Sequence, residues 1–156
     1  MLFLLFQLGP DRYALPAERV VEVVPLLELK RLPEAPKGVA GIFNYRGRPV
    51  AAIDLCALTL DRPASERLST RIIIVKYSDA RGANHLLGLV AEQATKIMRK
   101  DAKDFVPLDT KLGAPPYLGP ILTDGDGMIQ LLHEQRLLSE RACELLFSEG
   151  ANHEGN

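Results

Sequence analysis

Tryptophan is absent from the 156-residue sequence, cysteine is scarce, and the net charge is close to zero. The chain has 19 Lys and Arg residues against 20 Asp and Glu residues, which gives a formal net charge of −1. Proteins that hold nucleic acid by its phosphates need clustered Lys and Arg, and single-strand binders add exposed aromatic rings, so neither class is expected. The two cysteines, Cys56 and Cys143, lack the spacing of a disulfide scaffold or a zinc knuckle. This cysteine usage fits a reducing compartment, the cytoplasm.

Long apolar runs are also missing. A membrane-spanning helix needs about 20 apolar residues, whereas the apolar run at residues 2–8 ends at Gly9-Pro10-Asp11. Because this run lacks the basic start and the cleavage site of a signal peptide, it is predicted to be a buried strand, and no direct membrane insertion is expected. With 47% apolar residues, the chain can form the core of an ordinary domain.

The motifs of common enzyme and metal sites are incomplete. His133-Glu134 resembles the start of a zinc-protease helix, but the second histidine would fall at position 137, which is Leu137. Residues 124–127 resemble the start of a calcium loop, but Ile129 and Gln135 occupy the positions that need Gly and Glu. Nucleophile-elbow, P-loop and Rossmann glycine patterns are absent. We therefore expect no catalytic residues, no cofactor and no metal site.

Short β-prone runs separated by turn signals fill most of the chain. Their spacing of about 8–12 residues predicts an all-β fold with short helices, a sandwich or barrel rather than a parallel sheet. The expected strands are residues 3–8, 12–15, 20–24, 39–45, 48–53, 72–77, 86–91, 95–98, 117–122 and 128–132.

Helical signals are few. A single turn is expected at residues 16–19, and a short helix at 54–60 with Asp54 as its N-cap. A C-terminal helix is predicted with Ser139 as a possible cap. Its apolar positions are Leu137, Leu138, Ala142, Leu145 and Leu146. Residues 101–120 should form an irregular crossing. The polar connector at 62–69 divides the strands into two similar halves, which suits two small barrels packed together.

One hairpin combines side chains suited to protein contacts. Strand alternation places Phe43 and Tyr45 on one face and Asn44 on the other, with Arg46 at a tight turn closed by Gly47. Arginine offers a planar fork for a carboxylate, and tyrosine supplies contact area at low entropic cost. An ordinary solvated tip is the alternative, and it is the commoner use of arginine in a turn.

The order of motifs resembles the CheW-like coupling proteins of bacterial chemosensory arrays over residues 2–146. The matching pieces are the opening hairpin at 3–16, Val-x-Glu-Val at 20–23, the stretch 38–55 that contains the counterpart of Asn-Leu-Arg-Gly, the strands 70–75 and 88–90, Tyr-Leu-Gly at 117–119, and the closing strand and helix at 130–138. Each piece is weak alone, but together and in register they are specific. The resemblance implies two five-stranded SH3-like barrels around a shared core, with a C-terminal helix. Residues 1–148 would form one domain with lobes at 12–69 and 70–132, followed by a flexible tail at 149–156.

The same resemblance implies a function without catalysis. Such proteins join the cytoplasmic tip of a methyl-accepting chemoreceptor to the regulatory domain of a CheA-type histidine kinase, and they can form mixed rings in arrays. The chain would then be cytoplasmic and located at receptor arrays through its partners.

By resemblance, Arg46 and Glu22 fall on residues implicated in partner contacts, and they pair either with each other or with the partner. The expected partner-binding residues are Arg46, Tyr45, Asn44, Gly47, Glu22, Val20 and Val21. For the valines the alternative is core burial, since strand alternation sends half of them inward.

Several positions depart from the family pattern. Tyr45 replaces a leucine, Ala51-Ala52 replaces a bulkier pair, Ala91-Glu92 stands for an apolar residue followed by Asp, and His133 replaces Asp or Asn. These departures suggest a dedicated system, such as a Wsp-type surface-sensing pathway with a diguanylate cyclase as its output.

Two other functions compete with the coupling protein. One is a small-ligand-binding or enzymatic β-barrel with a pocket between the lobes, lined by His85, His133 and Asp54. The other is a scaffold that self-associates edge to edge.

Overall fold

Strands dominate the computed structural model, which describes residues 1–108 and 113–148. The expected tail at 149–156 lies outside the described residues. Nine strands occur within them: β1 (Leu2–Leu8), β2 (Asp11–Pro16), β3 (Val20–Pro25), β4 (Val39–Tyr45), β5 (Arg48–Asp54), β6 (Arg71–Ser78), β7 (Asn84–Arg99), β8 (Leu118–Asp124) and β9 (Gly127–Leu132). The expected all-β class is confirmed.

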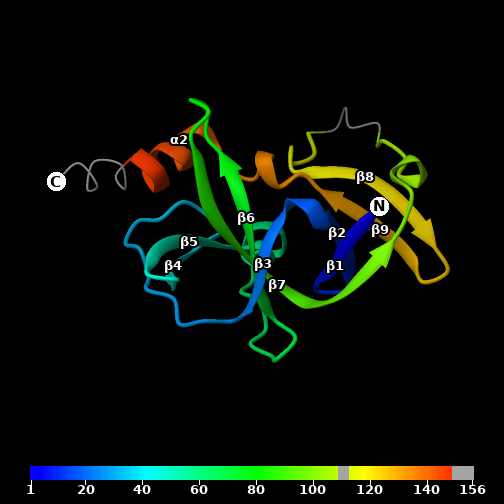
Figure 1. The fold of residues 1–156 in the computed structure, drawn as a ribbon, viewed down its shortest axis with the longest axis horizontal. Helices are drawn as coiled ribbons and strands as arrows, with labels where there is room; N and C mark the ends of the chain where they lie inside the picture. The colour runs from blue at the N-terminus through cyan, green and yellow to red at the C-terminus, as the bar shows by residue number, and fades with distance from the viewer. Residues whose placement is uncertain (109–112, 149–156) are drawn as a thin grey trace.

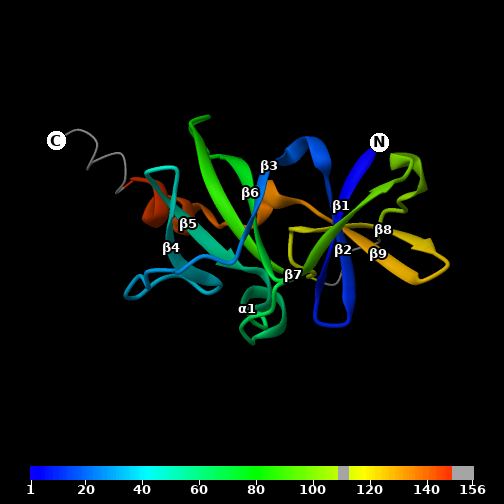
Figure 2. The ribbon, with the colours of Figure 1, turned by 60° about the horizontal axis from the view of Figure 1, so that its bottom comes forward.

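Strand pairing divides the molecule into two lobes that share β7. Lobe I contains β3, β6, the first half of β7, β5 and β4, in that order of pairing. Lobe II contains the second half of β7, then β1, β2, β9 and β8. The lobes lie side by side, and β7 passes from one to the other (Figures 1 and 2).

These pairings assign strands to the two lobes differently from the expected lobe limits of residues 12–69 and 70–132. β2 pairs with β1 and β9 in lobe II, whereas β6 pairs with β3 in lobe I. The reason is that each lobe is completed by strands from distant parts of the chain, which a division at a linker cannot express. That residues 1–148 act as one domain stays a prediction.

The expected strand at 95–98 is not separate, because it is the end of the 16-residue β7. Around Gln93 the register with β1 shifts, and Gln93 has a positive φ of 49°. A β-bulge of this kind absorbs extra residues and bends a strand without ending it. The sequence pattern breaks at the bulge, which made one strand look like two.

The short helices match their capping signals. α1 (Leu55–Leu60) is capped by Asp54, whose Oδ1 accepts hydrogen bonds from the backbone N–H groups of Cys56 and Ala57 at 2.9 and 3.1 Å. Ser139 caps α2 (Glu140–Cys143), so the expected C-terminal helix begins after Leu137 and Leu138 and not with them. Single turns complete the set: η1 (Ala17–Arg19), η2 (Ala102–Asp104), η3 (Glu134–Arg136) and the π-helical η4 (Glu144–Ser148).

The largest hydrophobic cluster belongs to both lobes, in agreement with the expected shared core. Its side chains come from strands of each lobe and from α1, and most are fully buried. Members include Phe6, Leu8 and Leu15 of lobe II and Ile53, Leu55, Ile73, Val75, Leu87 and Leu89 of lobe I. Because apolar burial is the main favourable term in folding, this cluster contributes strongly to the association of the two lobes.

One side chain completes the pairing of β6. Beyond Val75, where pairing with β3 stops, Gln135 donates from Nε2 to the carbonyl of Lys76 at 2.6 Å and accepts at Oε1 from the N–H of Ser78 at 2.9 Å. A primary amide offers a donor and an acceptor side by side, as a strand backbone does. Gln135 therefore satisfies the backbone groups at this end of the β6 edge.

Candidate partner-binding site

The hairpin between β4 and β5 ends in a tight two-residue turn. Tyr45 pairs with Arg48, so the loop is Arg46-Gly47, with φ values of 52° and 83°. Two positive φ values are typical of the type I′ turn, which matches the twist of a hairpin. The Oδ1 atom of Asn44 accepts a hydrogen bond from the Gly47 N–H at 2.8 Å. Asn44 and Gly47 thus fix the turn that carries Arg46.

A β-bulge in β3 determines which of its side chains reach the surface. Val20 pairs with Val75 and Glu22 with Ile74, which leaves Val21 as the extra residue. Val21 is 43% exposed, whereas Val20 is half-buried and packs against the largest core cluster. Core packing, the alternative for the valines, therefore describes Val20, and Val21 remains available to a partner.

Glu22, Tyr45 and Arg46 meet at one carboxylate oxygen. Tyr45 donates from its hydroxyl to Oε1 of Glu22 at 2.6 Å, and Arg46 donates from Nη2 to the same oxygen at 2.9 Å. The guanidinium carbon of Arg46 also lies 5.3 Å from the centre of the Tyr45 ring. The hydrogen bond to Glu22 raises the pKa of Tyr45. In this chain Glu22 and Arg46 therefore pair with each other, a question that the sequence left open.

These contacts lie across the seam of lobe I, the line along which β3 and the residues after it, up to Lys30, face β4. β3 and β4 stand at the two ends of its strand order. Near the other end of the seam, Lys30 and Ile42 exchange two backbone hydrogen bonds of 2.8 and 2.7 Å. The Arg46 side chain is 74% exposed and that of Glu22 is 36% exposed. The seam thus carries a charged pair on the surface.

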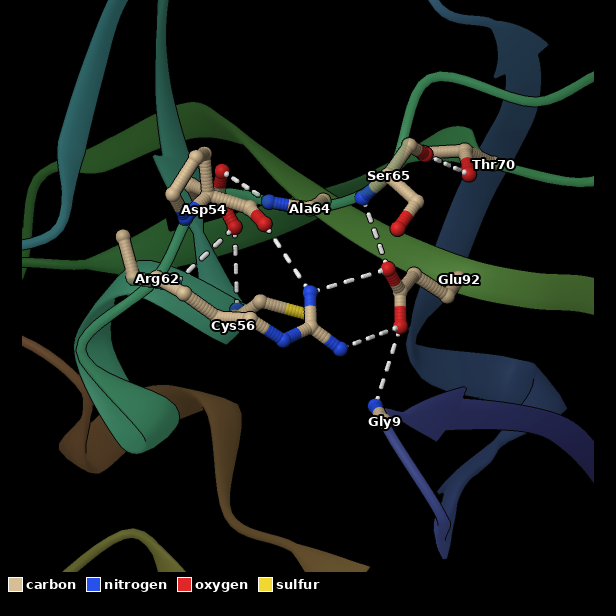
Figure 3. Close-up of polar contacts among 10 residues, drawn as sticks. Gly9, Asp54, Cys56, Arg62, Ala64, Ser65, Thr70 and Glu92 are labelled. Atoms are coloured by element: carbon tan, nitrogen blue, oxygen red, sulfur yellow. Dashed lines mark hydrogen bonds and ion pairs between the residues drawn. The ribbon is translucent and has the colours of Figure 1, made fainter.

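A second polar cluster was not recognised as such in the sequence. Glu92 lies in β7 where the strand leaves lobe I, and its carboxylate is held from both sides (Figure 3). The N–H of Gly9, in the β1–β2 turn, donates to Oε1 at 2.9 Å, and the N–H of Ser65 donates to Oε2 at 2.7 Å. Arg62 donates to both oxygens at 3.2 Å. Glu92 therefore ties a turn of lobe II to the connector of lobe I.

The pKa of Glu92 reflects these contacts. Burial alone would raise the pKa, but the hydrogen bonds from Arg62, Ser65 and Gly9 outweigh burial and lower it to about 2. In the sequence, Glu92 is an acidic residue directly after the apolar run at 86–91, at a position where the family pattern has Asp. Asp54 also holds this connector, because its Oδ2 accepts a hydrogen bond from the N–H of Ala64 at 2.9 Å.

The three residues of the expected ligand pocket do not meet in one cavity. Asp54 lines an open groove of about 740 Å³ in lobe I, between residues 26–32 and α1, and neither His85 nor His133 lines it. His85 instead bonds to Asp79 at 2.8 Å and stacks on Phe147. Asp54 and His85 therefore each serve a local contact of their own, and the structure gives no support to a ligand pocket that combines them with His133.

The described residues do not indicate a metal site, a reactive cysteine or a membrane-spanning helix. Across 1–108 and 113–148, no group of three or more His, Cys, Asp or Glu side chains is placed to hold a metal ion. Burial raises the pKa of the Cys56 thiol to about 11, which keeps it protonated and unreactive. No helix in the described part of the chain has the length and apolar character needed to cross a membrane.

Comparisons with known proteins agree with the motif order. The CheW-like domain family model matches residues 2–142. The chain is 27% identical over 139 residues to chemotaxis protein CheW of Helicobacter pylori, which covers 88% of this chain and 81% of that protein. It is 27% identical over 139 residues to protein FrzA of Myxococcus xanthus, covering 87% and 84%. The crystal structure of the scaffolding protein TtCheW from Thermoanaerobacter tengcongensis has a TM-score of 0.76 at 24% identity, covering 90% and 89%. The expected resemblance is confirmed: the chain belongs to the CheW-like domain family.

Proposed function

We infer that this protein is a non-catalytic coupling protein of a chemosensory array. It joins the cytoplasmic tip of a methyl-accepting chemoreceptor to the regulatory domain of a CheA-type histidine kinase. The observation that carries this function is the family match over residues 2–142, nearly the whole chain. Two relatives are named chemotaxis protein CheW, and the solved neighbour is described as a scaffolding protein.

The hairpin turn supports this role because it is both exposed and ordered. Arg46 is largely exposed, yet its turn is fixed by Asn44 and its guanidinium is held by Glu22. Guanidinium groups are well suited to interface ion pairs, and a side chain that is already ordered loses less entropy when a partner binds. Val21 adds an exposed apolar surface on the neighbouring strand.

The same proposal gives the protein its place in the cell. It works in the cytoplasm and reaches the membrane through its receptor. Ring or array assembly would arise from contacts with the kinase regulatory domain. Self-association alone would instead appear as light scattering that increases with concentration in the absence of any partner.

Arg46→Glu is expected to weaken co-assembly with receptor and kinase by about 100-fold or more. The change removes the exposed guanidinium and places a second carboxylate beside Glu22. The thermal midpoint should stay within about 3 °C, because the site is on the surface. Co-sedimentation or pull-down with a receptor signalling fragment and the kinase regulatory domain measures the loss.

Arg81→Glu is the matched control, since it makes the same charge change in an exposed turn between β6 and β7. It should bind like the unmodified protein. If Arg46→Glu co-assembles as well as Arg81→Glu does, the turn is not the contact surface.

A further inference from the structure

Tyr45 belongs to the hydrophobic core and to the charged surface at once. The residue is 9% exposed, and it packs in the second core cluster with Phe43 and Val50. Its hydroxyl reaches across the seam from the end of β4 to Glu22 on β3. A side chain whose ring is fixed by packing has few conformations, so its hydroxyl is a well-placed anchor.

The anchor leaves one side of Glu22 available. Oε1 accepts both internal hydrogen bonds, and within the described part of the chain no hydrogen bond is made to Oε2. The raised pKa of Tyr45 keeps the phenol protonated, so it acts as a donor. A carboxylate held at one oxygen in this way can accept a further hydrogen bond at the other.

Tyr45 also orders Arg46. The guanidinium lies near the face of the Tyr45 ring and bonds to the oxygen that the hydroxyl holds. An arginine in an exposed turn otherwise samples many rotamers, and these are lost when it binds. The ring and the hydroxyl therefore act on the two charged groups together.

We propose that Tyr45 is a positioning residue that holds Glu22 and Arg46 in one arrangement and so determines which partner surface they fit. The pair presents a free carboxylate oxygen beside an exposed guanidinium. The complementary surface carries an acidic side chain opposite Arg46 and a basic or other hydrogen-bond donor opposite Glu22. This inference rests on the proposed function and identifies the chemistry of the contact.

Tyr45→Phe keeps the ring and removes the hydroxyl, and it should weaken binding to the kinase regulatory domain by about tenfold. Tyr45→Leu, which also removes the ring, should weaken it further. Tyr117→Phe is the matched control, because it removes a hydroxyl that contacts Thr59 away from the site. That control should bind like the unmodified protein.

A double-mutant cycle separates positioning from direct contact. If the hydroxyl acts through Glu22, then Tyr45→Phe should cause no further loss of affinity in a Glu22→Ala protein, which has no acceptor for the hydroxyl. An equal loss in both backgrounds would mean that the hydroxyl touches the partner itself, which overturns the proposal.

A measurement without partner keeps this inference distinct from the proposed function. The ¹⁵N relaxation of the Arg46 Nε–H group should report an ordered side chain in the unmodified protein and a mobile one, like that of Arg81, in Tyr45→Leu. If the unmodified protein binds neither receptor nor kinase, the proposed function fails while the relaxation data still decide the role of Tyr45. An Arg46 side chain that is equally mobile with and without Tyr45 contradicts the inference.

Discussion

Glu92→Gln is expected to lower the free energy of unfolding at pH 7 by about 2–3 kcal/mol. Glu92 is 8% exposed, and its two oxygens accept hydrogen bonds from two backbone N–H groups and from Arg62. Glutamine keeps the size but has one acceptor oxygen and no charge. The loss is limited because the Arg62 side chain is 43% exposed and regains water. Urea unfolding of both proteins measures the difference.

The Glu92 carboxylate should also make the stability of the protein depend on pH. The pKa of Glu92 is lowered from 4.5 to about 2 in the folded chain. A lowered pKa means that the stabilisation is fully present above about pH 4.5 and is lost as the pH falls toward 2. The Glu92→Gln protein should lack this contribution, so the stability difference between the two proteins should shrink over that range.

Glu66→Gln is the control for Glu92, since it makes the same chemical change at an exposed position of the same connector. Its unfolding curve should match that of the unmodified protein. A Glu92→Gln protein that is as stable as Glu66→Gln at pH 7 would show that the lobes are joined by apolar packing alone.

Gly41→Ala is expected to destabilise the fold by about 3 kcal/mol or more. A Cβ atom at this position would lie 2.4 Å from the carbonyl oxygen of Lys30. Gly41 also has a φ of 149°, a backbone conformation that residues with a side chain rarely adopt. The strand could accept the methyl group only by moving Lys30 and Ile42 apart, and these residues exchange the two backbone bonds of the seam. Thermal unfolding measures the loss of stability.

Partner binding should fall together with stability in Gly41→Ala, because Glu22 and Tyr45 meet across the same seam. Gly125→Ala serves as the control, since nothing lies within 4 Å of a Cβ atom there. It should change neither property. If Gly41→Ala is as stable as the unmodified protein, β4 can move away from Lys30 without loss of stability. That result would contradict the prediction.

Local patterns in the sequence predicted most of the elements of the fold. The β-prone runs located the strands, and Asp54 and Ser139 identified the starts of α1 and α2. These features depend on neighbouring residues, so a linear reading can find them. The limits of the lobes depend instead on which strands pair, as β2 with β9 and β6 with β3 show. Pairing between distant segments leaves little trace in a single sequence.

The candidate site shows the same division. The hairpin motif identified Arg46 and its turn, and the resemblance identified Glu22. Their mutual contact, and the hydroxyl of Tyr45 between core and surface, depend on how β3 and β4 approach each other. The exposure of Val21 depends on a bulge that strand alternation does not predict. Membership of a surface-sensing system stays a prediction, since it depends on partners and not on this chain.

The amide of Gln135 has a consequence for the solubility of the protein. Exposed backbone groups on a strand can template the addition of an extended segment from another molecule, which is a common route to aggregation. Gln135 occupies the carbonyl of Lys76 and the N–H of Ser78 with a side chain, which has no further strand to extend. Where many copies of the chain lie close together, this amide blocks the addition of a further strand at that edge.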